Sequence, residues 1–324
     1  MNQTELNLKE LSEKIIRETE KIIVGKTDEI RLVLMAILAN GHILLEDMPG
    51  AGKTTLVKTL SKVLGCTSGR IQFVPDLLPS DIIGMTIYNQ KTGDFELRQG
   101  PVMTNILLAD EINRAIPRTQ SALLEAMEER QVTIDNVRYT LPEPFIVLAT
   151  QNPIEMESTF KLPAAQMDRF LIKLSLGYPK HDDEVKMLAN LGNRIPFEQL
   201  EAVTNQSEIL RAQEEAAKVY LSDDVANYIV ALTESTRNHG QLAMGAGPRA
   251  SLALYKASKV WAAMDGRDFV TPDDVKAVAK PVTVHRIVLT SEARYSGCSA
   301  EQIIEEILEN TPVGADAEDM IHGV

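Results

Sequence analysis

A short apolar run leads directly into a glycine loop and then into a helix. In the stretch HILLEDMPGAGKTTLVKTL, the run His42–Leu45 predicts a buried strand, and Lys53–Leu64 predicts a helix with leucines on one face. Gly50 and Gly52 lie between them. In the pattern G-x-x-x-x-G-K-[ST], such glycines let backbone N–H groups approach phosphate oxygens at a helix N-terminus. The order strand, loop, helix therefore predicts an α/β fold with a phosphate-binding loop.

The loop departs from this pattern at its first position. Asp47 lies where the pattern has glycine, whereas Gly52, Lys53 and Thr54 match the closing triplet. Aspartate tolerates left-handed backbone geometry better than most residues. Its carboxylate must point away from the phosphates, because two anions within about 4 Å repel strongly in a partly buried site. We interpret the stretch as a working loop with a non-standard first turn, and a plain glycine-rich turn is the alternative.

Two residues at the end of the loop have predicted chemical roles. Lys53 supplies a positive charge for the β- and γ-phosphates of a nucleotide, and the Thr54 hydroxyl can bind Mg²⁺. The predicted nucleotide-binding residues of the loop are Met48, Pro49, Gly50, Ala51, Gly52, Lys53, Thr54 and Thr55.

Polar side chains also follow two later apolar runs. Asp110 and Glu111 follow Ile106–Ala109, and Asn152 follows Phe145–Ala149 closely. Asp110 is a candidate Mg²⁺ ligand, and Glu111 could orient and polarise an attacking water. Asn152 could reach the γ-phosphate or that water. The alternatives are a solvated acidic turn and an asparagine that caps a turn before a proline.

Alternating strands and helices predict a mostly parallel sheet covered on both faces. The remaining predicted elements of this part are strands Ile71–Val74 and Phe170–Leu174, helix Pro117–Glu129, and hairpins made of Thr86–Asn89 with Phe95–Arg98 and of Gln131–Ile134 with Arg138–Leu141. Gly177–Pro179 has the composition of a hinge. From there on the pattern is almost entirely helical, with Thr271 predicted as an N-cap before a proline and two acids.

The motifs, taken together, resemble one family. The stretches GHILLEDMPGAGKTT, LLADEINRAIPRTQSALLEAMEERQVT, LATQNP and LPAAQMDRF are similar to those of MoxR-type AAA+ ATPases. The resemblance extends from Glu20 to Arg249 and, more loosely, to Val288. It implies an AAA+ P-loop core, a parallel sheet flanked by helices with hairpin insertions, followed by an all-α lid domain. The expected domains are the nucleotide-binding core 1–178, a linker 179–204 and the lid 205–324.

The resemblance also implies roles for residues outside the loop. Arg169 lies where such proteins have an arginine finger that reaches the γ-phosphate held by a neighbouring subunit, unless it is a surface arginine paired with Asp168. Arg249 lies where they have the sensor 2 arginine at the start of a lid helix, and the alternative is an ordinary helix-start arginine. Val24 and Gly25 would lie near the adenine, with ATP between the core and the lid.

Some roles stay open at this level. The hairpins at 86–98 and 131–141 resemble insertions of the same branch of AAA+ proteins, and their tips would face a ring pore or a partner unless they are plain sheet extensions. Arg114 and Arg118 could contact a neighbouring subunit's nucleotide or simply lie on an exposed helix face.

The resemblance implies a Mg²⁺-dependent ATPase that forms a homo-oligomeric, hexameric ring. Its expected role is chaperone-like maturation of client proteins, often with a von Willebrand factor A-domain partner. We expect it in the cytoplasm, because the sequence has two cysteines without a CxxC motif, no signal peptide and no apolar stretch long enough to span a membrane.

The sequence also bears on three rival functions. An MCM-type nucleic-acid motor is disfavoured by the net charge of −13, which results from 33 Lys and Arg against 46 Asp and Glu. A chelatase motor subunit belongs to the same branch and is poorly separated by sequence. A non-catalytic ATP-binding scaffold is disfavoured because Lys53, Asp110, Glu111 and Asn152 are all present.

Overall fold

The computed structural model describes residues 7–47, 50–152, 160–189 and 197–313. The chain divides into two compact units. An α/β unit comprises Glu13–Phe170 and Leu174–Leu210, and a helical unit comprises Met1–Ser12, Leu171–Lys173 and Arg211–Val324.

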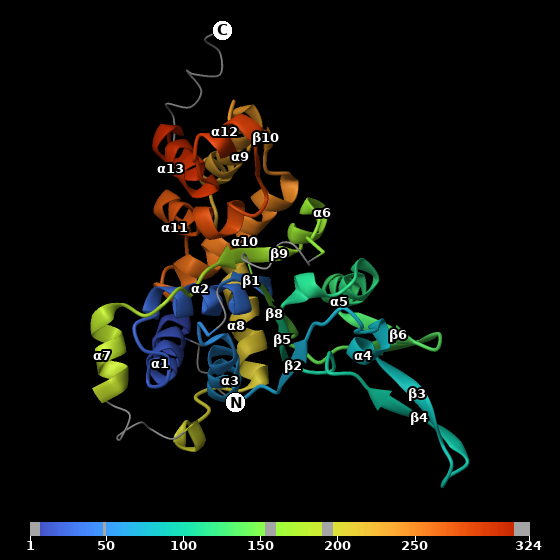
Figure 1. Cartoon of the computed structure of the whole chain (residues 1–324). Coiled ribbons are helices and arrows are strands. Elements are labelled where there is room, and N and C mark those ends of the chain that lie inside the picture. The colour runs from blue at the N-terminus through green and yellow to red at the C-terminus, as the bar shows by residue number, and fades with distance from the viewer. Residues whose placement is uncertain (1–6, 48–49, 153–159, 190–196, 314–324) are drawn as a thin grey trace. The chain divides into compact units, whose positions relative to one another are not determined.

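A five-stranded sheet forms the centre of the α/β unit (Figure 1). Its strands lie in the order β2, β5, β8, β1, β9 and span Ser68–Gln72, Ile106–Asp110, Ile146–Gln151, His42–Glu46 and Phe170–Leu174, respectively. The neighbours from β2 to β1 pair in parallel, so their carboxyl ends meet at one edge of the sheet. The predicted parallel sheet flanked by helices is confirmed.

Both faces of the sheet are apolar, and the inner strands β1, β5 and β8 are buried along almost their whole length. Successive side chains of a strand point to opposite faces. Leu107, Val147 and Phe170 therefore pack in one cluster with Leu123 and Met127 of α5. Helices α2 and α3 lie on the opposite side of the sheet (Figure 1). The helices α2 to α7 belong to this unit, whereas α1 and α8 each have residues in both units. Their bounds are α1 (Leu8–Glu20), α2 (Thr27–Leu38), α3 (Lys53–Val63), α4 (Pro79–Ile83), α5 (Pro117–Glu129), α6 (Ala164–Met167), α7 (His181–Ala189) and α8 (Gln206–Lys218).

Two elements differ from the sequence prediction. Strand β2 was predicted at Ile71–Val74 and lies at Ser68–Gln72, because an edge strand needs few buried residues and only Ile71 is buried here. The second is the short helix α4, which was not among the predicted elements and has proline at its first position. The Asp81 carboxylate accepts a hydrogen bond from the backbone N–H of Leu78 and stabilises this short helix.

Both predicted hairpins are present. Strands β3 (Gly84–Asn89) and β4 (Asp94–Gln99) pair antiparallel, and the hairpin extends away from the rest of the α/β unit (Figure 1). Strands β6 (Gln131–Ile134) and β7 (Val137–Thr140) are joined by Asp135 and Asn136 alone, both with positive φ, 49° and 66°. Val137, predicted in the turn, pairs with Ile134 because two left-handed residues suffice for a tight hairpin turn.

The helical unit packs α9 (Asp223–Asn238), α10 (Pro248–Met264), α11 (Pro272–Thr283), α12 (Ser291–Tyr295) and α13 (Ala300–Asn310). The predicted N-cap Thr271 is confirmed, and its capping box uses the carboxylate of Asp274. Arg267 donates to both oxygens of that carboxylate at 2.6 Å. A short antiparallel pair, β10 (Leu242–Met244) with β11 (Val288–Leu289), interrupts the helices, and strands this short leave no clear alternation in the sequence.

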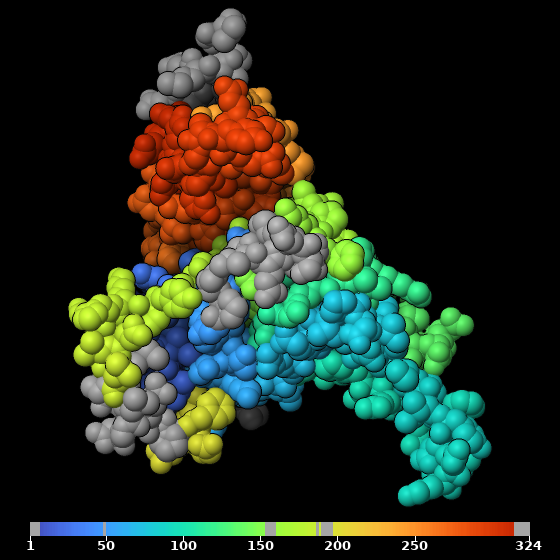
Figure 2. Space-filling model, viewed as in Figure 1, coloured from blue at the N-terminus to red at the C-terminus, as the bar shows by residue number. Residues whose placement is uncertain are grey.

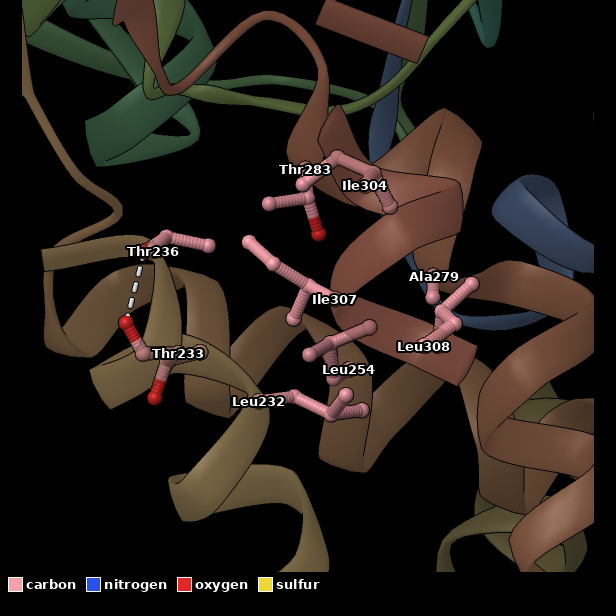
Figure 3. Close-up of a pocket in the computed structure, with 9 residues that line it drawn as sticks. All are labelled: Leu232, Thr233, Thr236, Leu254, Ala279, Thr283, Ile304, Ile307 and Leu308. Carbon is pink, nitrogen blue, oxygen red and sulfur yellow. Dashed lines mark hydrogen bonds between the residues drawn. The ribbon is translucent and has the colours of Figure 1, made fainter. Parts of the chain in front are cut away.

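A small pocket lies in the core of the helical unit (Figure 3). Its lining is mainly apolar and includes Leu254 and Ile307, together with three threonines, Thr233, Thr236 and Thr283. The Thr236 hydroxyl donates to the Thr233 carbonyl at 2.6 Å, and the Thr233 hydroxyl donates to the Val230 carbonyl. The hydroxyls of Thr233 and Thr236 thus bond to backbone carbonyls, and with its mainly apolar lining we interpret the pocket as a packing feature of the helices.

Within the described ranges, none of the helices combines the length and the apolar character that a bilayer crossing requires.

Candidate nucleotide-binding site

The glycine loop connects the end of β1 to the start of α3. Gly50 and Gly52 have φ of 87° and 79°, a left-handed conformation that favours glycine. A Cβ atom at either glycine would meet nothing within 4 Å, so there is open space beside the loop. Gly52 is the N-cap of α3 and has no side chain to cap the helix. The first N–H groups of α3 are thus available to an anion. Met48 and Pro49 lie outside the described residues.

Lys53 is held at the loop. Its Nζ donates a hydrogen bond to the backbone carbonyl of Asp47 at 3.2 Å. Lys53, Ala51 and Thr54 are half-buried, whereas Thr55 is exposed. The ammonium group therefore lies over the loop, where phosphate oxygens would compete with a single neutral carbonyl for it.

The Asp47 carboxylate is buried, with the residue only 3% exposed. It accepts hydrogen bonds from the Ser175 hydroxyl at 2.6 Å and from the N–H groups of Leu176 and Gly177, each at 2.9 Å. These three donors satisfy a buried carboxylate without a cation. The acid that departs from the loop pattern is therefore turned toward the segment that follows β9.

Asp110 ends β5, and both of its carboxylate oxygens are engaged. Oδ1 accepts from the Thr150 hydroxyl at 2.7 Å, and Oδ2 lies 2.7 Å from the Arg70 guanidinium. Thr150 is in β8, and Arg70 is in β2, the strand on the other side of β5. The Arg70 side chain is 51% exposed, so this ion pair contributes little stability and a metal cation could displace it.

Glu111 follows Asp110 and adopts a left-handed conformation with φ of 58°. For a residue other than glycine this costs on the order of 1–3 kcal/mol, and such strain is concentrated at functional sites. The Glu111 backbone N–H donates to the Thr150 hydroxyl at 2.8 Å. Its Oε2 accepts from Gln72 and from Arg114, both at 2.8 Å. The Arg114 side chain thus contacts its own chain's Glu111, while Arg118 is exposed at the start of α5.

Asn152 follows β8 directly and is 7% exposed. Because β5 and β8 pair in parallel, with Ala109 opposite Ala149, Asn152 leaves the sheet at the same edge as Asp110 and Glu111. Strand β1 pairs with the other side of β8 and leads into the glycine loop at this edge as well. The structure therefore brings the loop, the acid pair and the asparagine together.

Arg169 directly precedes β9, and its side chain contacts α5. Its Nη1 donates to the Leu124 carbonyl at 2.7 Å, and its Nε lies 3.6 Å from a carboxylate oxygen of Glu128. The residue's side chain is 30% exposed. The guanidinium thus lies near the C-terminal half of a helix of its own chain, where the helix dipole favours positive charge.

The remaining predicted site residues, Val24, Gly25 and Arg249, are on other segments than the loop, the acid pair and Asn152. Gly25 has φ of 72°, and a Cβ atom there would lie 2.3 Å from Oδ2 of Asp183, so α7 approaches the chain closely at this glycine. Val24 beside it is half-buried. Arg249 is exposed in the first turn of α10 and belongs to the helical unit.

A divalent cation has suitable ligands at this edge. The hydroxyl of Thr54 and the carboxylate of Asp110 are oxygen donors, the type that Mg²⁺ prefers. Mg²⁺ usually takes one or two protein ligands and completes its shell with waters and substrate phosphates. The two residues therefore fit Mg²⁺ held together with a nucleotide.

Three residues of this site were missed by sequence reasoning: Arg70, Gln72 and Thr150. Thr150 lies within the motif LATQNP, and a polar residue near the end of an apolar strand was a usable signal. Arg70 and Gln72 carry no comparable signal, because their contact with the acids depends on β2 pairing with β5 in the observed register, Gln72 opposite Asp110.

Comparison with known families gives two matches along the chain. A model described as the ATPase family associated with various cellular activities (AAA) matches residues 42–172. A model of the AAA lid domain matches residues 234–307. The first range contains the glycine loop, the acid pair, Asn152 and Arg169, and the second contains Arg249.

Individual relatives are similar over nearly the whole chain. Protein YeaC of Bacillus subtilis (strain 168) is 48% identical over 295 residues, 91% of this chain and 92% of that protein. Chaperone MoxR1 of Mycobacterium tuberculosis is 43% identical over 306 residues, 92% and 81% of the two chains. A crystal structure from Cytophaga hutchinsonii, described as a candidate ATPase, has a TM-score of 0.88 and 41% identity, covering 94% of this chain and 96% of that one.

Proposed function

This chain belongs to the MoxR family of AAA+ ATPases, and from that premise we propose that it hydrolyses ATP with Mg²⁺ in a ring of identical subunits and uses the cycle to remodel client proteins. The ATPase activity itself follows from the family. The metal, the ring, the client and a cytoplasmic location are the parts that we propose.

One observation supports the hydrolytic mechanism above the others. The glycine loop, Asp110 with Glu111, and Asn152 follow three neighbouring parallel strands and meet at one edge of the sheet. In open α/β sheets, ligands bind at the carboxyl ends of the strands. The N–H groups at the start of α3 and the Lys53 ammonium would bind the phosphates there.

Each residue of the site has a separate role in the proposed hydrolysis. Thr54 and Asp110 would hold Mg²⁺, which supplies positive charge at the phosphate oxygens. Glu111 would accept a proton from the attacking water, and Asn152 would orient that water or the γ-phosphate. To do so, Glu111 must exchange its contacts with Gln72 and Arg114 for the water. Arg169 of a neighbouring subunit would stabilise the developing charge. Arg249, Val24 and Gly25 keep their predicted roles as sensor and adenine contacts.

The β3–β4 hairpin supports a polypeptide client. Tyr88 and Phe95 pair across it with ring centroids 5.3 Å apart, and they are 56% and 73% exposed. Figure 2 shows the hairpin projecting into open space from the surface in that view. Exposed apolar groups of this kind mark interaction sites for protein surfaces. Lys91 near the tip is offset by Asp94, and the net charge of −13 disfavours a phosphate backbone as partner.

The client role and the location have separate support. The name Chaperone MoxR1 of a relative supports chaperone-like work, and a von Willebrand factor A-domain partner follows only from the family resemblance. Cys66 and Cys298 are both free thiols, which suits a reducing cytoplasm.

The experiment that tests this function measures phosphate release at increasing protein concentration, with Mg²⁺ and with EDTA. We expect the specific activity to rise with concentration as rings assemble and to vanish with EDTA. Glu111→Gln should lower kcat about 10²-fold or more, because it removes the base. Glu96→Gln, on the exposed β4 strand, is the matched control and should retain activity. Phosphate release that Glu111→Gln leaves unchanged would contradict the assigned chemistry.

A further inference from the structure

Asp47 connects two parts of the α/β unit that are far apart in sequence. Its carboxylate accepts three hydrogen bonds from the segment Ser175–Gly177, at 2.6, 2.9 and 2.9 Å. Successive backbone N–H groups beside a left-handed residue form a concavity that holds an anion. Gly177 has φ of 60°, and here the anion is the Asp47 side chain.

The main chain of the same residue contacts the nucleotide-binding loop. The Asp47 carbonyl accepts a hydrogen bond from Lys53 Nζ at 3.2 Å. One residue therefore contacts the phosphate-binding lysine through its backbone and the segment after β9 through its side chain. A displacement of one contact changes the geometry of the other.

The segment after β9 has a second attachment. Lys26 Nζ donates to the Tyr178 carbonyl at 3.1 Å and lies 3.3 Å from a carboxylate oxygen of Glu29. Lys26 follows Gly25 directly, at the predicted adenine end of the site. Residues 175–178 are thus attached both to the loop that would bind phosphates and to the start of α2.

We propose that Asp47 is a positioning residue that couples nucleotide binding at the glycine loop to the segment Ser175–Tyr178. The inference rests on the proposed ATP-binding function. When a triphosphate binds, Lys53 exchanges the Asp47 carbonyl for phosphate oxygens, which changes the position of the Asp47 main chain. The Asp47 side chain carries this change to the Leu176 and Gly177 amides. An acid at the first position of the loop is thereby explained by a function that glycine cannot perform.

The test measures amide hydrogen exchange at Leu176 and Gly177 in the full chain, with and without Mg²⁺ and the nonhydrolysable analogue AMP-PNP. In the wild type we expect AMP-PNP to slow exchange of both amides by about three- to tenfold, the effect of strengthening one hydrogen bond. In Asp47→Gly, which restores the glycine of the pattern, exchange should be fast and insensitive to saturating AMP-PNP. We also expect AMP-PNP to bind this variant about three- to tenfold more weakly.

Asp47→Asn gives a residue-specific signature that general destabilisation would not produce. The asparagine oxygen can still accept from Ser175 and Gly177, whose bonds share one carboxylate oxygen, Oδ1. Its NH₂ group would then face the N–H of Leu176, which bonds to Oδ2 in the wild type. Exchange should therefore accelerate more at Leu176 than at Gly177.

Two further variants complete the test. Ser175→Ala removes one donor and leaves both amide bonds, so it should keep the response to AMP-PNP, and it remains informative if Asp47→Gly fails to fold. Asp76→Asn, in an exposed turn, should behave as wild type. A wild-type response that persists in both Asp47 variants would overturn the coupling while leaving ATP binding intact. Failure of the wild type to bind AMP-PNP would instead overturn the proposed function, and this inference with it.

Discussion

Thr150 joins the two acidic residues of the site through a single hydroxyl group. The hydroxyl donates to Asp110 at 2.7 Å and accepts the N–H of Glu111 at 2.8 Å, and the residue is fully buried. The bond to Glu111 helps hold its left-handed backbone, and the bond to Asp110 orients a predicted metal ligand. Residues that orient metal ligands typically contribute 10- to 100-fold, as an order of magnitude, in metal affinity or activity.

We therefore expect Thr150→Val, which keeps the shape and removes the hydroxyl, to lower kcat or the apparent Mg²⁺ affinity by about 10- to 100-fold. In the same variant the Asp110 carboxylate keeps its ion pair with Arg70. Thr150→Ser keeps the hydroxyl and should stay close to wild type. Steady-state ATP hydrolysis over a Mg²⁺ titration measures both quantities. Equal activity of the valine and serine variants would show that the hydroxyl has no part in the site.

At the scale of elements, sequence patterns succeeded where burial is continuous or capping is local. Helix α5 and strand β9 have the predicted bounds, because Pro117 marks a helix start and an unbroken apolar run marks an inner strand. The predicted bounds of strand β2 were wrong because Ile71 is its only buried residue, so no apolar run marks it. The side chains of Arg70 and Gln72, which contact the acids, could therefore not be assigned from a pattern of apolar residues.

His42 joins three elements at the start of the inner strand β1. Its Nε2 donates to the Met127 carbonyl of α5 at 3.1 Å, and its Nδ1 accepts from the N–H of Val147 in β8 at 3.0 Å. Burial, with a smaller effect of the nearby Arg130 charge, lowers the pKa of His42 from 6.5 to about 3. The His42 ring is therefore neutral in the folded protein near neutral pH.

This depressed pKa predicts a loss of stability in mild acid. Below pH 6.5 the unfolded chain binds a proton at His42, whereas the folded chain does so only near pH 3, so the free energy of unfolding falls through this window. At pH 5 the loss amounts to about 2 kcal/mol relative to pH 7 or above. Urea unfolding between pH 8 and pH 5, as approximate limits, measures it. His42→Gln retains a donor and an acceptor and should lack this part of the slope, and an identical slope in the variant would rule out His42 as its source.

At the scale of the whole molecule, the resemblance of the motifs to those of MoxR-type AAA+ ATPases was enough to predict the AAA+ core, the lid and the family. Hydrogen bonds between distant segments were not accessible in this way. The bonds of Asp47 to Ser175–Gly177 join segments 128 to 130 positions apart, and no local pattern in either segment indicates the other. The domain boundaries at 178 and 205 stay a prediction, as do the catalytic roles of individual residues.

The proposed ring adds a requirement that one chain cannot show by itself, since Arg169 contacts α5 of its own chain. To act on a neighbouring subunit, Arg169 must leave the Leu124 carbonyl and Glu128. One hydrogen bond and a partly exposed ion pair cost about 1–2 kcal/mol to break. An arginine finger contributes about 10³- to 10⁵-fold in kcat, roughly 4–7 kcal/mol of transition-state stabilisation. The cost of freeing Arg169 would therefore cancel only part of the gain in rate that the proposed ring provides.

A mixture of two defective variants tests whether the site is shared. Glu111→Gln and Arg169→Ala should each be nearly inactive alone, because each lacks one part of every site. In an equal mixture, about a quarter of the interfaces combine an intact Glu111 with an intact Arg169 from the neighbour, so about a quarter of wild-type turnover should return. Glu111→Gln mixed with Lys53→Ala is the matched control. Lys53 and Glu111 serve the same chain's site, so no interface in that mixture is complete and no turnover should return. Equal recovery in both mixtures, or none in either, would contradict a site built from two subunits.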